Sequence, residues 1–334
     1  MSNHTRKRVS IVGALAATAL LALAACSSSG GTTTPGAAAG AGAKIIKVGF
    51  SQVGSESGWR AANTKDIQST LTKANGFDLK FSDAQQKQEN QIQAIRSYIA
   101  QGVDVIAFSP VVESGWDAVL EEAKAAKIPV VLTDRAVDSK DTSLYKTFLG
   151  SDFIKEGKLV GEWVVKDSGD KAVNIVELQG TTGSAPANDR MAGFKAAISG
   201  HANLKIIASQ TGNFTRSEGK AVMEGFLQAN PKIDLVFAHN DDMGLGAMEA
   251  IEAAGKVPGK DIKIVTIDAV KDGMQALADG KFNFIGECSP LLGQQLADVV
   301  KQIMAGKTPE QRIITQETTF TQEQPKAALP TRKY

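Results

Sequence analysis

Residues 88–108 read QENQIQAIRSYIAQGVDVIAF, and this stretch decides the fold class. Its first part places Ile92, Ile95 and Ile99 three or four residues apart, the spacing of one helix face, and Gly102 follows as a stop signal. Residues 103–108, VDVIAF, form a short apolar run that is typical of a strand buried on both faces. A helix that leads directly into such a strand predicts a βαβ unit in a parallel sheet.

The same alternation continues along the chain and predicts two similar halves. Strands are expected at 45–50, 79–82, 129–132, 146–149, 173–178, 205–209, 235–238, 263–267 and 282–286, and helices at 59–75, 116–126, 155–165, 189–198, 218–228, 243–254, 273–278 and 292–304. A polar break at 138–145 divides the series, and no tandem repeat of sequence is visible. We therefore predict an α/β fold of two doubly wound parallel-sheet lobes. Ligands bind such sheets at the carboxyl ends of the strands, and two facing lobes would place those ends around one cleft.

Length and composition suit two ordinary globular domains. The chain has 334 residues, of which 43% are hydrophobic and 22% charged. Its net charge is +1, but the first 25 residues hold three basic residues and no acidic one, so the remainder carries 34 basic and 36 acidic residues. A near-neutral body argues against an electrostatic nucleic-acid binder. Two cysteines, Cys26 and Cys288, are too few for a disulfide scaffold or a cysteine-based zinc site.

The first 43 residues are predicted to direct export. Basic residues at 6–8 precede the apolar run VSIVGALAATALLALAA at 9–25, which is the order of a secretory signal peptide. A membrane-spanning helix is the alternative, but the run is shorter than the about 20 residues that a span usually needs. The ending LAAC at 23–26 resembles the lipobox of bacterial lipoproteins, which implies removal of residues 1–25 and acylation of Cys26. Residues 26–43 are then lipid anchor and flexible tether, and Cys288 is expected to be a small buried hydrophobe.

Polar and aromatic side chains gather at the ends of the predicted strands. They include Ser51, Trp59, Arg60, Gln85, Asp134, Arg135, Asp189, Arg190, Phe214, Arg216, Asn240, Asp268 and Glu287. Carboxylates accept hydrogen bonds, guanidinium groups donate them and amides do both, while an aromatic ring offers a flat face to the C–H side of a sugar. The set therefore suits a neutral polyol. For any single residue the alternative is a helix cap, a surface ion pair or a solvated loop, as with Asp134 and Asp189.

Catalytic and metal-binding patterns are weak. His239 follows a predicted strand and is expected to be structural, and no Ser-His-Asp set is apparent. Residues 54–58, GSESG, have Glu56 where a nucleophile elbow needs serine. Asp241 and Asp242 lack the further ligands of a metal site. We expect no enzymatic activity, no cofactor and no metal, although sequence leaves the paired carboxylates of a glycosidase open.

Several longer stretches resemble a known family. They are LTDR at 132–135, VELQG at 176–180, FAHNDDM at 237–243 and ID at 267–268. Over about residues 44–334 the chain resembles the type I periplasmic sugar-binding proteins of ABC importers, the ribose and galactose class. The stretches GFSQVGSESGWR at 49–60 and QQKQENQ at 85–91 are similar to the galactofuranose-binding components of such importers.

The resemblance implies a function and a set of ligand contacts. It implies an exported monomer, lipid-anchored at the outer face of the cytoplasmic membrane, that captures a monosaccharide by hinge closure and delivers it to the permease subunits of the importer. The implied sugar is galactofuranose or a related aldose. The implied contacts are Trp59 and Phe214 on the ring, Asp134, Arg135, Arg190, Asn240 and Asp268 on hydroxyls, Arg60, Gln85 and Glu287 as further contacts, and Ser51 and Arg216 as additional candidates. The chain departs from the class at Phe153, where Asn is common, and at Ala269, where Gly is common.

The resemblance also implies that the lobes are interleaved in sequence. The first lobe would be residues 44–147 plus 288–313, and the second 148–287 plus 314–334, with hinge crossings near 148, 287 and 314.

Three alternative functions are a sugar-sensing partner of a chemoreceptor or sensor kinase, a sugar-modifying hydrolase or isomerase, and a transcription regulator. The last needs an N-terminal helix-turn-helix, which the signal-like residues 1–43 do not offer.

Overall fold

The computed structural model describes residues 44–334, whose strands form two six-stranded sheets. The predicted signal peptide, acylated Cys26 and tether lie outside the described residues. The strands of the first sheet are β1 (Ile46–Gln52), β2 (Phe77–Asp83), β3 (Val105–Phe108), β4 (Val130–Thr133), β5 (Thr147–Gly150) and β11 (Arg312–Ile314). Those of the second are β6 (Val173–Gln179), β7 (Leu204–Thr211), β8 (Leu235–Ala238), β9 (Lys263–Asp268), β10 (Phe284–Glu287) and β12 (Thr319–Thr321).

The two sheets share one topology. The strand order is β11-β5-β4-β3-β1-β2 in the first and β12-β10-β9-β8-β6-β7 in the second. Among the described strands only β12 runs antiparallel to its partner, β10, and the other pairs are parallel. Helices connect the parallel strands, because a parallel pair needs a crossover. The predicted α/β fold of two doubly wound lobes is confirmed.

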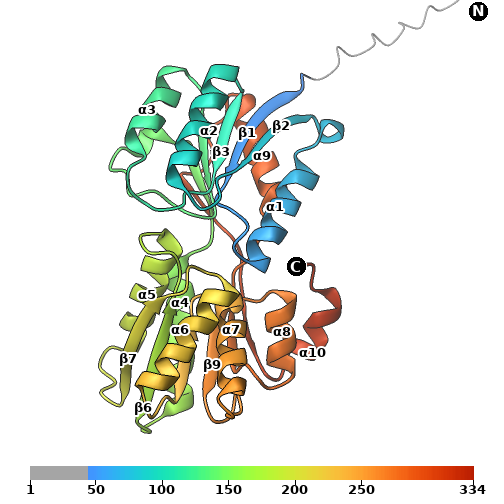
Figure 1. Ribbon diagram of the computed structural model, residues 1–334. Coiled ribbons are helices and arrows are strands. Elements are labelled where there is room, and N and C mark those ends of the chain that lie inside the picture. The colour runs from blue at the N-terminus through green and yellow to red at the C-terminus, as the bar shows by residue number, and fades with distance from the viewer. Residues whose placement is uncertain (1–43) are drawn as a thin grey trace, which may run out of the picture. The chain divides into compact units, whose positions relative to one another are not determined.

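Helices cover both faces of each sheet (Figure 1). The first lobe contains α1 (Gly58–Thr70), α2 (Gln88–Gln101), α3 (Asp117–Ala125) and α9 (Gly293–Met304). The second contains α4 (Phe153–Ser168), α5 (Ala185–Ile198), α6 (Arg216–Ala229), α7 (Asp241–Ala253), α8 (Lys271–Ala278) and α10 (Pro325–Ala328). Short 3-10 helices lie at Lys73–Asn75, Thr142–Leu144 and Leu329–Thr331.

The stretch at 88–108 folds as its pattern predicts. Ile95 is fully buried on the inner face of α2, and Gly102 ends the helix with a φ of 59°, a left-handed conformation that glycine adopts without strain. In β3, Val105 and Ala107 pack with α1 and α9, whereas Ile106 and Phe108 pack with α2 and α3. Both faces of the strand are therefore buried, which explains its continuous apolar sequence.

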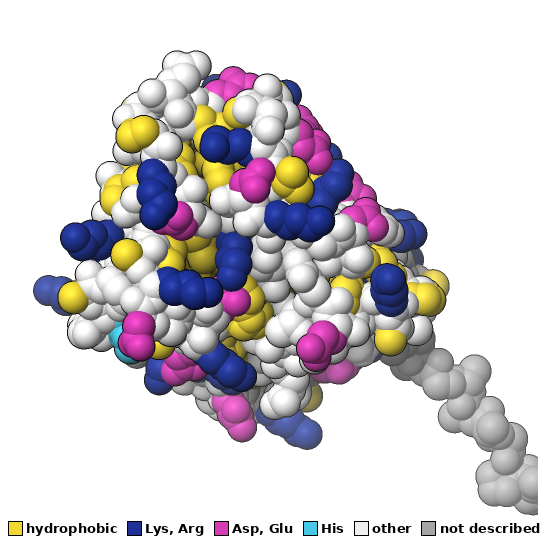
Figure 2. All heavy atoms as spheres, turned by 90° about the horizontal axis from the view of Figure 1, so that it is seen from below, with side chains coloured by type: hydrophobic (Ala, Val, Ile, Leu, Met, Phe, Trp, Pro, Cys, Tyr) yellow, Lys and Arg dark blue, Asp and Glu magenta, His cyan; other side chains and the backbone are white. Residues whose placement is uncertain are grey.

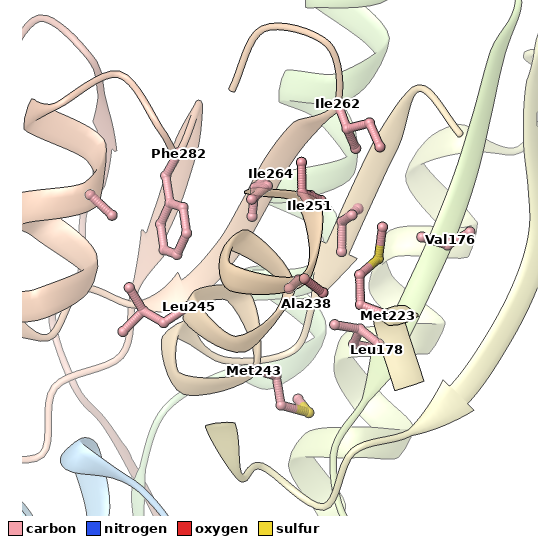
Figure 3. Close-up of a cluster of buried hydrophobic side chains, with 14 of the residues drawn as sticks. Val176, Leu178, Met223, Ala238, Met243, Leu245, Ile251, Ile262, Ile264 and Phe282 are labelled. Carbon is pink, nitrogen blue, oxygen red and sulfur yellow. The ribbon is translucent and has the colours of Figure 1, made fainter. Parts of the chain in front are cut away.

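The second lobe has the same layered core. Figure 3 shows one layer, in which Met243, Leu245 and Ile251 of α7 lie with Met223 of α6. The strand side chains that they cover include Val176, Leu178, Ala238 and Ile264. On the other face of the sheet, α4 and α5 bury residues such as Val160 and Phe194. Burial on both faces makes this sheet a rigid support for the loops at its strand ends.

The chain passes between the two lobes three times. Residues 147–149 of β5 pair with β4 and Gly150 pairs with Ile314 of β11, so the whole of β5 belongs to the first sheet and the first crossing, predicted near 148, follows Gly150. The second crossing lies between β10 and α9, and the third between β11 and β12. Ser151, Cys288, Thr315 and Glu317 come from the three crossings and form a hydrogen-bonded hinge cluster.

Charged side chains of both signs are interspersed on the face shown in Figure 2. This mixture agrees with the near-neutral composition of the chain. Within residues 44–334, no helix is both long and apolar enough to cross a membrane.

Candidate functional site

A cavity lies where loops from both lobes meet. Its walls are Glu56, Ser57, Trp59, Arg60, Asp134, Arg135, Pro186, Arg190, Phe214, Asn240, Asp268 and Cys288. Each wall residue ends a strand or follows one, namely β1, β4, β6, β7, β8, β9 or β10. The cavity is therefore at the carboxyl ends of the strands of both sheets, where doubly wound sheets bind ligands.

The structure brings together eight of the twelve side chains that the sequence analysis assigned to a ligand. They are Trp59, Arg60, Asp134, Arg135, Arg190, Phe214, Asn240 and Asp268. Ser51, Gln85, Arg216 and Glu287 are not among the residues that line the cavity.

Two of these four lie near the end of β1 or β2. Ser51 is fully buried within β1. Gln85 is exposed in a turn with a φ of 54°, and its backbone N–H donates to Asp83 Oδ1 at 2.7 Å. The turn directs Gln85 to solvent, because a residue in a tight turn after a strand no longer follows the alternation of the strand.

The other two are engaged in ion pairs outside the cavity. Arg216 is 41% exposed and contacts Asp272 at 3.2 Å. Glu287 Oε1 accepts hydrogen bonds from Arg332 at 2.7 Å and from the Tyr334 hydroxyl at 3.0 Å. Glu287 thus faces the C-terminal segment, and the next residue, Cys288, lines the cavity instead.

Four wall residues were not predicted from the sequence, namely Glu56, Ser57, Pro186 and Cys288. Glu56 had a visible signal, because it lies in the same strand-end loop as Trp59 and Arg60. Cys288 directly follows Glu287 at the end of β10. Successive side chains of a strand point to opposite faces of the sheet, so a prediction that is one residue off selects the face turned away from the cavity.

Arg60 occupies the centre of a carboxylate cluster. Its Nε contacts Glu56 Oε1 at 3.0 Å, its Nη2 contacts Asp134 Oδ2 at 2.7 Å, and its Nη1 donates to Gln52 Oε1 at 3.2 Å. Burial alone would lower the pKa of Arg60, but the adjacent Asp134 and Glu56 carboxylates raise it overall. The guanidinium therefore stays charged and fixes the orientation of both carboxyl groups.

Arg135 is less completely paired than Arg60. Its Nη1 donates to the Val111 carbonyl at 3.2 Å, and Glu56 and Asp134 lie 3.5 and 3.8 Å from its other nitrogens. Its Nε has no hydrogen-bond partner among the described residues. Burial and the neighbouring Arg60 lower its pKa to about 10, so it remains protonated at neutral pH.

Arg190 organises the second lobe's side of the cavity. Its Nε donates to Glu156 Oε2 at 2.8 Å, its Nη1 donates to the His239 carbonyl at 2.5 Å, and Asp268 lies 3.8 Å away. Burial raises the pKa of Glu156 to about 8 and raises that of Asp268 well above its ordinary value. His239 itself contacts Glu177 at 3.1 Å and is not among the residues that line the cavity.

Two aromatic rings complete the walls. Trp59 Nε1 donates to the Cys288 carbonyl at 2.7 Å, which holds the indole of the first lobe against the hinge. Phe214 lies beside the guanidinium groups of Arg135 and Arg190, 5.3 and 6.0 Å from its ring centroid. A Cβ at position 180 would overlap the Phe214 ring, so Gly180 of the VELQG stretch provides room for it.

The cavity contains an unusual concentration of left-handed backbone. Asp134, Phe214 and Asp268 have φ values of 61°, 63° and 130°. Each such conformation costs about 1–3 kcal/mol and persists where the surroundings enforce it, often at functional sites. Ala269, where the resembled class commonly has glycine, also has a φ of 65°. The other departure, Phe153, places its ring 5.1 Å from the Arg190 guanidinium.

Asn240 lines the cavity and also makes two hydrogen bonds within the second lobe. Its Oδ1 accepts from the Met243 N–H at 3.0 Å and so caps α7, while its Nδ2 donates to the Phe214 carbonyl at 3.0 Å. The start of α7 is thereby tied to the loop that carries the Phe214 ring.

Several buried polar atoms of the walls have no partner within the described part of the chain. They are Glu56 Oε2, Arg135 Nε and Asp268 Oδ2. Such atoms are costly unless a ligand or water binds them. Three guanidinium and three carboxyl groups line the cavity, so their formal charges nearly cancel. The walls thus offer both donors and acceptors without a strong field of either sign.

Within residues 44–334, one group of side chains has the proximity of metal ligands, namely Glu156, Cys288 and Glu317. One oxygen of each carboxyl group already has a partner: Arg190 binds Glu156 Oε2, and Glu317 Oε1 accepts from Thr315 at 2.8 Å and from Ser151. These bonds account for the group as part of the hinge cluster and its contact with Arg190, and we assign no metal to it.

Comparisons with known proteins identify the family. The family model described as "Periplasmic binding protein domain" matches residues 48–308. The galactofuranose-binding protein YtfQ of Escherichia coli (strain K12) is 50% identical over 292 residues, which cover 86% of this chain and 92% of that protein. A crystal structure from Mycobacterium smegmatis in complex with β-D-fucofuranose is 63% identical, with a TM-score of 0.84 and coverage of 86% of this chain and 95% of that chain.

A third relative has a similar fold. The binding component of the arabinose ABC transporter from Shewanella sp. ANA-3, bound to α- and β-L-arabinofuranose, is 49% identical, with a TM-score of 0.83. The alignment covers 86% of this chain and 96% of that chain. The predicted resemblance is confirmed, and the chain belongs to the periplasmic binding protein domain family.

Proposed function

We propose that this chain is the substrate-binding protein of an ABC sugar importer and binds a neutral monosaccharide in the cavity between its lobes. The observation that supports this most is the wall chemistry. Paired guanidinium and carboxyl groups, two aromatic rings and buried polar atoms without partners among the described residues surround one cavity. A neutral ligand with many hydroxyl groups satisfies these donors and acceptors together.

We further propose a furanose form of the sugar, galactofuranose or a related aldose. Support comes from the relatives, because one is named for galactofuranose and two solved structures hold β-D-fucofuranose and L-arabinofuranose. A site that hydrogen-bonds each hydroxyl discriminates strongly against an analogue that lacks one, since its buried polar groups are then left unpaired.

The proposed contacts are the eight predicted side chains that line the cavity. Trp59 and Phe214 would lie against the ring faces, with Asp134, Arg135, Arg190, Asn240, Asp268 and Arg60 on hydroxyls. We add Glu56, whose Oε2 is buried without a partner among the described residues. Gln85, Glu287, Ser51 and Arg216 are not included.

The transport steps are proposals of the same kind. The lobes, residues 44–150 plus 288–314 and residues 151–287 plus 315–334, would close about the hinge cluster and present the loaded protein to a permease. Anchoring through an acylated Cys26 and export by residues 1–25 complete the proposal. We propose no bond chemistry, so the sugar should be released unchanged.

Calorimetry with the purified chain tests the ligand. We expect binding of galactofuranose, and weaker binding of galactose, arabinose or ribose according to their furanose content and hydroxyl pattern. Charged analogues such as a uronate or an amino sugar should bind at least about tenfold more weakly, because the wall charges already nearly cancel. An absence of heat with every neutral sugar would overturn the proposal, and product that accumulates with time would indicate an enzyme instead.

A further inference from the structure

Among the described residues, two direct contacts join the lobes away from both the sugar cavity and the hinge. In the first, the backbone N–H of Gly58, at the start of α1 in the first lobe, donates to Asp242 Oδ2 of α7 in the second lobe at 2.8 Å. In the second, the loop after β3 meets the loop between β6 and α5. There the Glu113 N–H donates to the Gly183 carbonyl at 2.9 Å, and Asn188 Nδ2 donates to Glu113 Oε2 at 2.5 Å.

The Gly58–Asp242 contact compensates for a local deficiency of α1. The first turn of α1 contains no acidic residue, although negative charge is favourable at the N-terminus of a helix. Ser57 caps the helix by accepting from the Arg60 N–H at 3.1 Å, and the Gly58 N–H donates to Asp242 instead. Asp242 therefore provides, from the opposite lobe, both an acceptor and the negative charge that α1 lacks.

Asp242 has a second partner within its own lobe. Its Oδ1 lies 3.6 Å from Nε of Arg216, whose Nη2 also contacts the exposed Asp272 at 3.2 Å. Burial raises the pKa of Asp242, and the Gly58 N–H and Arg216 offset part of that effect. Arg216 belongs to the same lobe as Asp242, so this second contact does not depend on the position of the first lobe.

We propose that these two contacts form an interlobe latch, in which Asp242 is the principal positioning residue. The latch stabilises the closed arrangement by itself, without touching the ligand. A ligand that needs the closed arrangement then binds more tightly and leaves more slowly, because part of the free energy of closing comes from the protein. The prediction for ligand binding rests on the proposed function, whereas that for closing does not.

Two variants remove the Gly58–Asp242 contact from opposite sides. Asp242→Ala removes the acceptor. Gly58→Pro removes the donor and places a ring carbon where the N–H hydrogen was, which excludes the carboxylate. Proline is well tolerated at the first position of a helix. The preceding Ser57 already has the extended backbone, φ −146° and ψ 163°, that a residue before proline prefers.

Asp272→Asn is the matched control. It removes a carboxylate from the same Arg216, but Asp272 is 71% exposed and its ion pair lies within the second lobe. This variant tests whether any effect comes from the charge near Arg216 alone.

Small-angle scattering and stopped-flow dissociation of the purified full chain are the measurements. We expect Asp242→Ala and Gly58→Pro each to enlarge the radius of gyration of the ligand-free protein and to speed sugar dissociation about tenfold. The double variant should show little further change, because both substitutions remove one interaction. Asp272→Asn should behave as the unsubstituted protein.

Each alternative result overturns the latch. An unchanged radius of gyration in both single variants would show that the contact does not hold the lobes closed. Full additivity in the double variant would show that the two residues act independently. If no sugar binds at all, the proposed function fails, and the scattering comparison still decides about the latch.

Discussion

Replacement of the buried Glu156 by glutamine should change how the stability of the protein depends on pH. Glu156 lies in α4 and is 3% exposed. One of its oxygens accepts from Arg190, and the other has no partner within residues 44–334. Burial, with a smaller contribution from Glu317, raises its pKa to about 8, although Arg190 opposes the shift. Glutamine has nearly the same shape and no proton to lose.

The magnitude follows from the difference between folded and unfolded chains. An unfolded glutamate has a pKa near 4.5, so between that pH and about 8 the folded protein holds a proton that the unfolded chain has lost. The stabilisation is therefore full below about pH 4.5 and is lost as the pH rises through about 8. At 1.36 kcal/mol per pH unit, this one proton accounts for about 5 kcal/mol in the free energy of unfolding.

Urea denaturation of the purified chain between about pH 5 and 8 measures this effect. The unsubstituted protein should lose about 1.4 kcal/mol more per pH unit than Glu156→Gln over this range. Glu162→Gln on the same helix is the control, because Glu162 is 52% exposed and, among residues 44–334, pairs only with Lys158 at 3.6 Å. If Glu156→Gln and the unsubstituted protein lose stability with the same slope, Glu156 is not protonated in the folded state and the reasoning is wrong.

Three further predictions concern the cavity. Trp59→Ala and Asp134→Ala should each weaken sugar binding at least about tenfold in calorimetry, through lost ring contact or an unpaired hydroxyl, and unchanged affinity in both would place the ligand elsewhere. Gln85→Ala should leave the affinity within about twofold, because Gln85 is exposed outside the cavity, and a tenfold loss would return it to the site. Asn240→Ala should lower the free energy of unfolding by about 1 kcal/mol through loss of the α7 cap, so an unchanged melting temperature would contradict that role.

Elements with strong local signals could be predicted from sequence. The predicted helix at 88–101 coincides with α2, because its apolar spacing and Gly102 are both local features of the chain. The strands β11 and β12 went unpredicted, since each has three residues with little burial. Pairing with β5 or β10, far away in sequence, is what makes them strands.

The residues of the candidate site likewise differ in whether their position could be predicted from sequence. The position of Asp134 and Asp268 at the sheet edge could be predicted from sequence, because a polar residue at the end of a buried strand or directly after it must lie there. Glu287 faces away from the cavity because it accepts hydrogen bonds from Arg332 and Tyr334 in the C-terminal segment. Such long-range pairing leaves no mark in the local sequence.

The three crossings between the lobes also constrain the order of folding. The second lobe has its strands within one continuous stretch from β6 to β10, with only β12 added later. The first sheet, in contrast, is complete only when β11 has paired, and its helical layer is complete only when α9 has packed. Both elements come from the last part of the chain. Contacts of such long sequence separation form slowly. The first lobe, although it begins earlier in the sequence, should therefore finish folding after the second lobe. Until residues 293–314 pack against it, the edge of β5 remains uncovered.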